Sequence, residues 1–288
     1  MRPLLSLLGA TLLGLAVPAA AQPAASQGVP EPLRGAWYAG ECGDPQAMLV
    51  LTGRAAARID AEAPARLLRF RDTRTLQGWT LGTSVGADAP RMLLRGSAET
   101  LEVLEPDPKL RDDRLPGEAS PAIWRRCAVA PPALAMLHGE GVAFLAALEH
   151  IEVSCTAGAT PGAFTPGACA AAIVAQGDVS GDAKLSVAEI GRLVRGAAWV
   201  IAAQEGATQD LLLGAVGAGT LGGILTARLL MESMDYDGDG RLSAAEIAHD
   251  SVGFARTTGT PAGQPLRTQG LTEGAGMLRG LIEGLMAR

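Results

Sequence analysis

A thirteen-residue segment occurs twice in the C-terminal half of this 288-residue chain. Residues 178–190 read DVSGDAKLSVAEI and residues 235–247 read DYDGDGRLSAAEI, so eight of the thirteen positions are identical. Both copies begin with aspartate and carry glutamate at position 12 and leucine at position 8. Apolar stretches flank each copy, which predicts an acidic loop held between two helices.

The second copy places oxygen-bearing residues at regular intervals. The donors expected of it are, in chain order, the carboxylates of Asp235, Asp237 and Asp239, the backbone carbonyl of Arg241, an oxygen of Ser243 and the carboxylate of Glu246. Gly240 stands at position 6, where the chain must turn sharply. Calcium takes six to eight hard oxygen ligands, which alternate loop residues can supply. The spacing resembles the calcium loop of the EF-hand superfamily.

The resemblance covers about 70 of the 288 residues. It implies two units of helix, calcium loop and helix that work as a pair, with calcium as the cofactor. It also implies that Leu185 and Leu242, the two position-8 leucines, join the loops through a short two-stranded contact.

The first copy departs from the pattern at two positions. Its expected donors are the carboxylates of Asp178, Asp182 and Glu189, the side chain of Ser180 and the backbone carbonyl of Lys184. Ser180 stands where a carboxylate is usual, and Ala183 replaces the turn glycine. A left-handed alanine costs about 1–2 kcal/mol. We therefore expect a weaker site in the first loop; the alternative for either loop is an acidic surface turn that holds no metal.

The first residues predict an export signal. Arg2 gives a positive start, residues 4–17 form an apolar run, and three alanines at 19–21 offer a cleavage site before Gln22. Residues 1–21 are thus interpreted as a signal peptide and residues 22–32 as a linker. The run is too short for a comfortable membrane span of about 20 residues. No cysteine follows the cleavage site, so no lipid anchor is expected there. The alternative is an uncleaved anchor.

Four cysteines in an exported chain are expected to form disulfides, with free thiols as the alternative. Three connectivities are possible. Cys42 follows the first predicted strand and Cys127 lies in the last strand of the same block, so a closed sheet would bring these two together. Cys155 and Cys169 flank a loop rich in glycine, proline and threonine, which their bridge would close.

Residues 33–130 predict a domain of short antiparallel strands, a meander that closes into a small barrel. The predicted strands are Ala36–Ala39, Met48–Thr52, Ala56–Asp60, Arg66–Arg71, Leu76–Leu81, Arg91–Arg95, Thr100–Glu105 and Ile123–Val129. Trp37 near the start and Trp124 near the end make the block loosely similar to small lipocalin-like envelope barrels.

Residues 131–288 predict an all-helical domain that contains the paired loops, so the chain as a whole is expected to be a two-domain α+β protein. Pro131-Pro132 marks the boundary, and apolar residues over 134–151 recur at helical spacing. A last amphipathic stretch carries Leu271, Leu278, Leu281, Ile282 and Leu285.

Several function classes are disfavoured. A net charge of −6 argues against a nucleic-acid-binding protein. Residues 217–222 imitate a dinucleotide fingerprint, but the acids that would follow it belong to the second loop, so a glycine-rich helix is expected instead. Residues 82–86 imitate a hydrolase nucleophile elbow among short strands, where that motif does not work. A membrane span over residues 211–230 is the alternative for this apolar stretch. It would place the two loops on opposite sides of the membrane, where they could not pair. We expect no catalytic activity and no stable membrane span after signal cleavage.

The sequence therefore predicts an exported, non-catalytic calcium-binding protein, periplasmic or secreted, in which calcium braces or switches the loop pair. Extracellular modules bind calcium at about 10⁻⁴–10⁻³ M, which favours bracing. The alternative is an envelope protein whose barrel binds a small apolar ligand or another envelope protein, with calcium purely structural.

Overall fold

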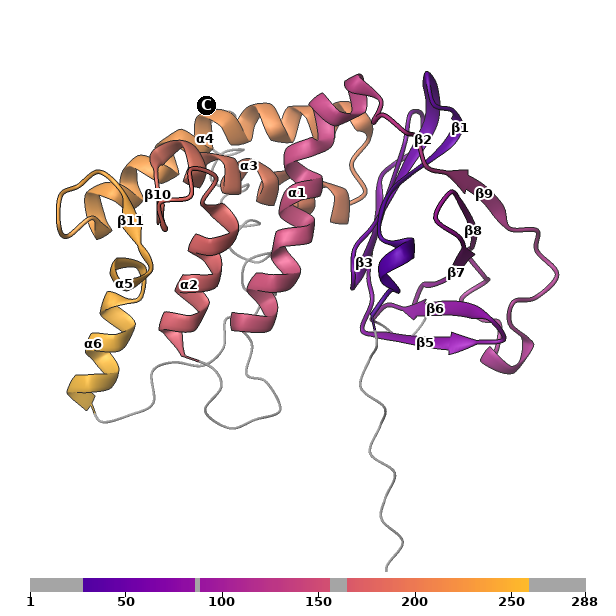
Figure 1. Ribbon diagram of the computed structural model, residues 1–288, viewed down its shortest axis with the longest axis horizontal. Helices are drawn as coiled ribbons and strands as arrows, with labels where there is room; N and C mark the ends of the chain where they lie inside the picture. The colour runs from indigo at the N-terminus through magenta and orange to yellow at the C-terminus, as the bar shows by residue number, and fades with distance from the viewer. Residues whose placement is uncertain (1–27, 86–88, 156–164, 259–288) are drawn as a thin grey trace, which may run out of the picture.

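The computed structural model describes residues 28–85, 89–155 and 165–258 of the chain (Figure 1). The predicted signal peptide and the amphipathic stretch at 271–285 lie outside these residues. Strands occupy the chain up to Arg125, and longer helices begin at Pro132, as the sequence predicts.

Nine strands form one antiparallel sheet. They are β1 Gly35–Glu41, β2 Asp44–Leu51, β3 Ala55–Asp60, β4 Arg66–Arg69, β5 Asp72–Leu76, β6 Trp79–Thr83, β7 Arg91–Gly96, β8 Thr100–Leu104 and β9 Ala122–Arg125. Their spatial order is β4-β3-β2-β1-β9-β8-β7-β6-β5. Two runs of consecutive strands are therefore joined by β9, which pairs with β1 on one side and β8 on the other.

The sheet curls into a half-barrel, and its ladder ends at β4 and β5 without pairing these two edges. The chain passes directly from one edge to the other at Phe70 and Arg71. The Phe70 amide donates to the carbonyl of Arg54 at 2.7 Å, and the Arg71 amide donates to Thr83 at 2.8 Å. These two backbone hydrogen bonds lengthen β4 and β5 by one bond each at the point where the chain passes between them. The two edges of the sheet therefore meet only at this end.

Several predicted strands differ in extent from the observed ones. The strand predicted as Arg66–Arg71 ends as β4 at Arg69, and β5 was not predicted as a strand of its own. The segment predicted as Leu76–Leu81 is the end of β5, a turn and the start of β6. Gln77 and Gly78 both have positive φ, at 49° and 80°, which is the conformation of a tight two-residue hairpin turn. The strand predicted as Ile123–Val129 ends as β9 at Arg125.

Large apolar side chains occupy the inside of the curl. Trp37, Leu49, Leu94 and Leu101 are fully buried there, and Trp124 is 2% exposed. They come from β1, β2, β7, β8 and β9, so both halves of the sheet contribute to one cluster. Side chains therefore occupy the space that a barrel-bound ligand would need.

The helices lie on one side of the sheet, next to β1, β2 and β3 (Figure 1). They are α1 Pro132–Cys155, α2 Pro166–Gly177, α3 Val187–Gln204, α4 Gln209–Met234, α5 Ala244–Ile247 and α6 His249–Thr258. Trp199 and Val200 of α3 pack in one buried cluster with Val50 of β2, Leu145 of α1 and Leu212 of α4. The β2 segment Ala47–Leu51 is buried without interruption because both faces of the sheet are covered.

Both predicted cysteine pairs lie at disulfide distance. The Cα atoms are 5.7 Å apart for Cys42–Cys127 and 4.5 Å apart for Cys155–Cys169. The first pair fastens the loop between β1 and β2 to the chain just after β9, and the second ties the end of α1 to α2. Disulfides are typical of an oxidising, extracytoplasmic compartment.

Among the described residues, two helices, α1 and α4, are long and apolar enough to cross a membrane by length and composition alone. Core helices of water-soluble proteins pass the same test, so this is weak evidence of a span. The fingerprint-like residues 217–222 lie inside α4 and form no strand-to-helix turn. Their neighbour Gly223 makes a close crossing with α3: a Cβ there would lie 3.0 Å from the carbonyl oxygen of Gly191.

Candidate functional site

The two repeated loops occupy equivalent positions between helices. The first connects α2 to α3 and the second connects α4 to α5. Each ends in a capping box: Ser186 and Glu189 close the start of α3, and Ser243 and Glu246 close the start of α5. In such a box the serine side chain accepts from the glutamate backbone while the glutamate reaches back, so the last loop residues are fixed by the helix they begin.

The loops are joined to each other by a short ladder. Strands β10 Lys184–Leu185 and β11 Leu242–Ser243 pair antiparallel, with Leu185 opposite Leu242. Both leucines are 2% exposed and belong to a buried cluster with Ile190 of α3 and Met231 of α4. The ladder therefore couples the position of one loop to that of the other.

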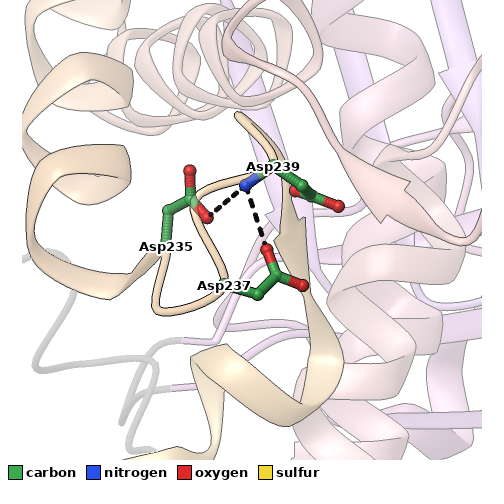
Figure 2. A group of neighbouring side chains, drawn as sticks. All are labelled: Asp235, Asp237 and Asp239. Carbon is green, nitrogen blue, oxygen red and sulfur yellow. Dashed lines mark hydrogen bonds between the residues drawn. The ribbon is translucent and has the colours of Figure 1, made fainter.

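Three carboxylates converge in the second loop. Asp235, Asp237 and Asp239 each offer an oxygen, and these oxygens all lie within 4.8 Å of one another. Figure 2 shows the Asp239 amide between the carboxylates of Asp235 and Asp237, to which it donates at 3.2 and 3.1 Å. The second oxygen of Asp235 accepts from the Gly240 amide at 2.9 Å. Backbone amides thus hold three like charges at short range.

Glu246 faces the same loop from the start of α5. One of its oxygens accepts from the amide of Tyr236 at 3.0 Å, and the other accepts from the Ser243 amide at 2.8 Å and its hydroxyl at 2.7 Å. The glutamate is 8% exposed. All four carboxylates that the sequence assigns to this site are therefore brought to one loop.

The first loop repeats this hydrogen-bond network almost bond for bond. Asp178 accepts from the amides of Gly181 at 2.6 Å and Ala183 at 2.7 Å, as Asp235 does from the equivalent residues. Glu189 accepts from Val179 at 2.8 Å and from Ser186 at 2.8 Å, as Glu246 does in the second loop. The two loops therefore share one backbone conformation and one hydrogen-bond pattern.

The departures of the first loop have visible consequences. Ser180 donates to Asp178 at 3.2 Å, so a hydroxyl stands where the second loop has a carboxylate. Ala183 adopts φ +60°, close to the +77° of Gly240 at the same place. The alanine is held in the left-handed region that side chains disfavour, so the strain expected from the sequence is present.

The two glutamates are held in their charged form. Burial of Glu189 opposes ionisation, but hydrogen bonds from Ser186, Ser180 and Val179 outweigh it and lower the pKa of Glu189 to about 2. Hydrogen bonds from the Ser243 side chain and backbone lower the pKa of Glu246 as well. Both carboxylates are therefore anionic at neutral pH and could serve as oxygen ligands of a metal ion.

The basic residues at position 7 make contacts that the sequence analysis did not predict. The Lys184 ammonium of the first loop pairs with Asp239 of the second loop and lies 3.3 Å from Asp237. The Arg241 guanidinium of the second loop pairs with Asp182 of the first. The only signal in the sequence was a basic residue at position 7 of both copies.

The cluster of Asp235, Asp237 and Asp239 could hold a metal ion, and both loops present oxygen atoms without histidine or cysteine. Hard oxygen donors favour calcium, magnesium or manganese over zinc or copper. No protein-family model matches the chain, and neither a curated protein nor a solved structure matches it.

Proposed function

We propose that the protein is an exported, non-catalytic calcium-binding protein and that its two loops form an EF-hand pair. The single observation that carries the proposal is the repeated network: equivalent amide hydrogen bonds to the carboxylates at positions 1 and 12, and equivalent capping boxes, recur in both loops, which are joined at Leu185 and Leu242. The ligands would be Asp235, Asp237, Asp239, Glu246, the Arg241 carbonyl and an oxygen of Ser243 in the second loop, and Asp178, Ser180, Asp182, Glu189 and the Lys184 carbonyl in the first.

The donor set supports calcium over magnesium. Calcium accepts six to eight oxygens in a flexible geometry, whereas magnesium demands a near-ideal octahedron and keeps several waters. A loop that presents four carboxylates together with a backbone carbonyl and a serine oxygen matches the larger ion. A bound divalent cation would offset the mutual repulsion of the Asp235, Asp237 and Asp239 carboxylates.

We infer that calcium braces the helical half of the molecule. The first loop immediately precedes α3 and the second immediately follows α4. Trp199 of α3 and Leu212 of α4 belong to the buried cluster that packs against the sheet. An ion that binds only the folded loop stabilises the fold by mass action. At about 1 mM calcium and a Kd of about 10⁻⁴ M, each occupied site would contribute about 1.4 kcal/mol.

The alternative function, ligand binding inside the sheet, receives less support. Trp37, Leu49 and Leu101 are fully buried where a ligand would have to enter, so binding would require the core to open. The proposed location is the periplasm or the outside of the cell. The signal-like start of the sequence and the two disulfides support this location.

Isothermal titration of metal-stripped mature protein tests the proposal. We expect calcium to bind at two sites, and magnesium at the same concentration to bind much more weakly. The matched control is the double variant Asp178→Asn/Asp235→Asn, which keeps both loop sequences in register and removes one carboxylate from each. Absence of heat at millimolar calcium in the wild-type protein, with a folded circular-dichroism spectrum, would overturn the proposal.

A further inference from the structure

The crossed ion pairs between the loops have a geometry that the ladder imposes. In the β10–β11 pairing, Lys184 lies opposite Ser243 and Leu185 opposite Leu242. The two position-7 residues therefore stand at equivalent places on either side of the pair. Lys184 reaches Asp237 and Asp239 of the second loop, while Arg241 reaches Asp182 of the first. Neither cation pairs with the carboxylates of its own loop in the described structure.

We propose that Lys184 and Arg241 are crossed counter-cations: each neutralises the other loop while that loop holds no metal, and each is displaced when a metal ion binds there. The inference rests on the proposed calcium sites and adds a specific control of their affinity. The carboxylates that Lys184 contacts are two of the proposed ligands of the second loop. An ammonium and a divalent cation therefore compete for the same oxygens.

The same geometry couples the loops. The backbone carbonyl of Lys184 is a proposed ligand of the first loop, while its side chain lies on the second. Metal binding to the second loop releases this side chain next to the first loop. Arg241 is placed the other way round: its carbonyl is a proposed ligand of the second loop, and its side chain lies on the first. A substitution at position 7 of one loop is therefore expected to change the affinity of the other.

The size of the expected change in calcium affinity follows from how exposed the ion pair is to water. The Lys184 side chain is 29% exposed and that of Asp239 is 38% exposed, so water screens the pair. Exposed ion pairs contribute little, so we expect about a 1.4- to 5-fold change in affinity. Because salt screens such pairs, the change should shrink as ionic strength rises.

The experiment measures the second loop alone, in full-length mature protein carrying Glu189→Gln to disable the first loop. Terbium, a calcium substitute, is excited through Tyr236, which lies at position 2 of the second loop, where the first loop has Val179. Displacement of terbium by calcium then gives the calcium affinity of the second loop. The variants added to this background are Lys184→Gln, Lys184→Arg and Lys109→Gln. Lys109, the only other lysine, is exposed and lies between β8 and β9.

Lys184→Gln is expected to tighten calcium binding to the second loop by about 1.4- to 5-fold at low salt and less at 0.5 M salt. Lys184→Arg should keep the parental affinity, and Lys109→Gln should leave it unchanged. An equal effect of Lys184→Gln and Lys109→Gln, or no effect of either, would overturn the inference while leaving the calcium sites standing. Failure of the parental Glu189→Gln protein to bind calcium or terbium would overturn both proposals.

The reciprocal arm uses Glu246→Gln to disable the second loop and calorimetry to measure calcium binding to the first. Arg241→Gln should tighten that binding, since it frees Asp182. The matched control is Arg111→Gln, an exposed arginine whose partner, Asp113 at 3.2 Å, lies far from the loops in sequence. Equal affinities for Arg241→Gln and its parent would show that the crossing has no effect in this direction and would overturn the reciprocal inference.

Discussion

At the scale of single residues, the two loops are ranked by the groups that they do not share. The second loop has the carboxylate of Asp237 where the first has Ser180, and the unstrained Gly240 where the first has Ala183. Glu246→Gln should therefore remove the tighter phase of a calcium titration, and Glu189→Gln only the weaker phase. The strain alone is worth roughly tenfold in affinity. Loss of the tighter phase in Glu189→Gln would invert this ranking.

The turn position gives a reciprocal pair of substitutions. Ala183→Gly relieves a left-handed alanine and should raise the calcium affinity of the first loop by up to about tenfold. Gly240→Ala introduces the same strain into the second loop and should lower its affinity by a similar factor. Calorimetry on the two single variants measures both changes. Shifts in the same direction would contradict the strain argument.

Buried His138 is expected to make the free energy of unfolding depend on pH. Its Nδ1 accepts from the Trp199 indole at 3.1 Å, its Nε2 has no hydrogen-bond partner within the described residues, and burial lowers its pKa from 6.5. Below about pH 6.5 the unfolded chain takes up a proton here that the folded protein does not, so the free energy of unfolding falls as pH falls. The slope approaches about 1.4 kcal/mol per pH unit.

Denaturant unfolding between pH 5 and 7 measures this slope. His138→Gln, which can still accept from Trp199, should flatten it. His150→Gln is the matched control, because His150 lies on the same helix and is exposed. An identical pH dependence in the wild-type protein and in His138→Gln would assign the effect to other groups.

The local placement of the loop carboxylates could be predicted from their spacing, while the metal that they would bind stays a prediction. The carboxylates of both loops lie where the repeat places them, because a loop of fixed length between two helices has few conformations. The contacts of Lys184 and Arg241 were missed because they depend on how the loops face each other, which the spacing within one loop does not specify. The burial of His138 was not predicted either, because it depends on the packing of α1 against Trp199 of α3.

At the scale of elements, two glycines in helices have opposite environments. A Cβ at Gly141 of α1 would lie 2.1 Å from the ring of Trp199, whereas Gly214 of α4 has open space around it. Gly141→Ala should therefore destabilise the protein by about 1–3 kcal/mol through overpacking. Gly214→Ala should stabilise it by up to about 1 kcal/mol through helix propensity.

Equilibrium unfolding in denaturant at a fixed calcium concentration compares these two variants. They make the same chemical change in the middle of a long helix, so helix propensity cancels between them. A gain in stability for both would mean that α1 and α3 separate easily enough to admit the methyl group.

Strands were predicted best where apolar and polar residues alternate along the chain, and worst where a short turn joins two strands. The alternation in Thr100–Leu104 gave β8 nearly in full, whereas the Gln77-Gly78 turn was absorbed into a single predicted strand. The curl of the sheet and the meeting of its first and last strands were expected, since a closed meander places β9 between β1 and β8. Local patterns did not indicate that the ladder stays open between β4 and β5, so that the sheet is a half-barrel.

At the scale of the whole molecule, the two disulfides should differ in their contribution to stability. Cys42–Cys127 spans 85 residues and Cys155–Cys169 spans 14. On the chain-entropy relation these spans give about 4–5 and about 3 kcal/mol, respectively. The paired serine variants Cys42→Ser/Cys127→Ser and Cys155→Ser/Cys169→Ser, unfolded in denaturant, should rank in that order.

Peptide mapping without reduction checks the pairing itself. A fragment that joins Cys42 to Cys155 would show that the connectivity is wrong. Equal losses of stability in the two paired variants would show that loop length does not govern the contribution of these bridges.

The position of β9 has a consequence for the order in which the molecule is assembled. Until residue 125 is available, β1 and β8 each present an unpaired edge, and the strands form two separate ribbons. Insertion of one four-residue strand merges them, and Cys127, two residues further on, can then reach Cys42. A chain synthesised from its N-terminus therefore completes the strand that joins the ribbons, and the cysteine that fastens them, almost together and last among the parts of the sheet.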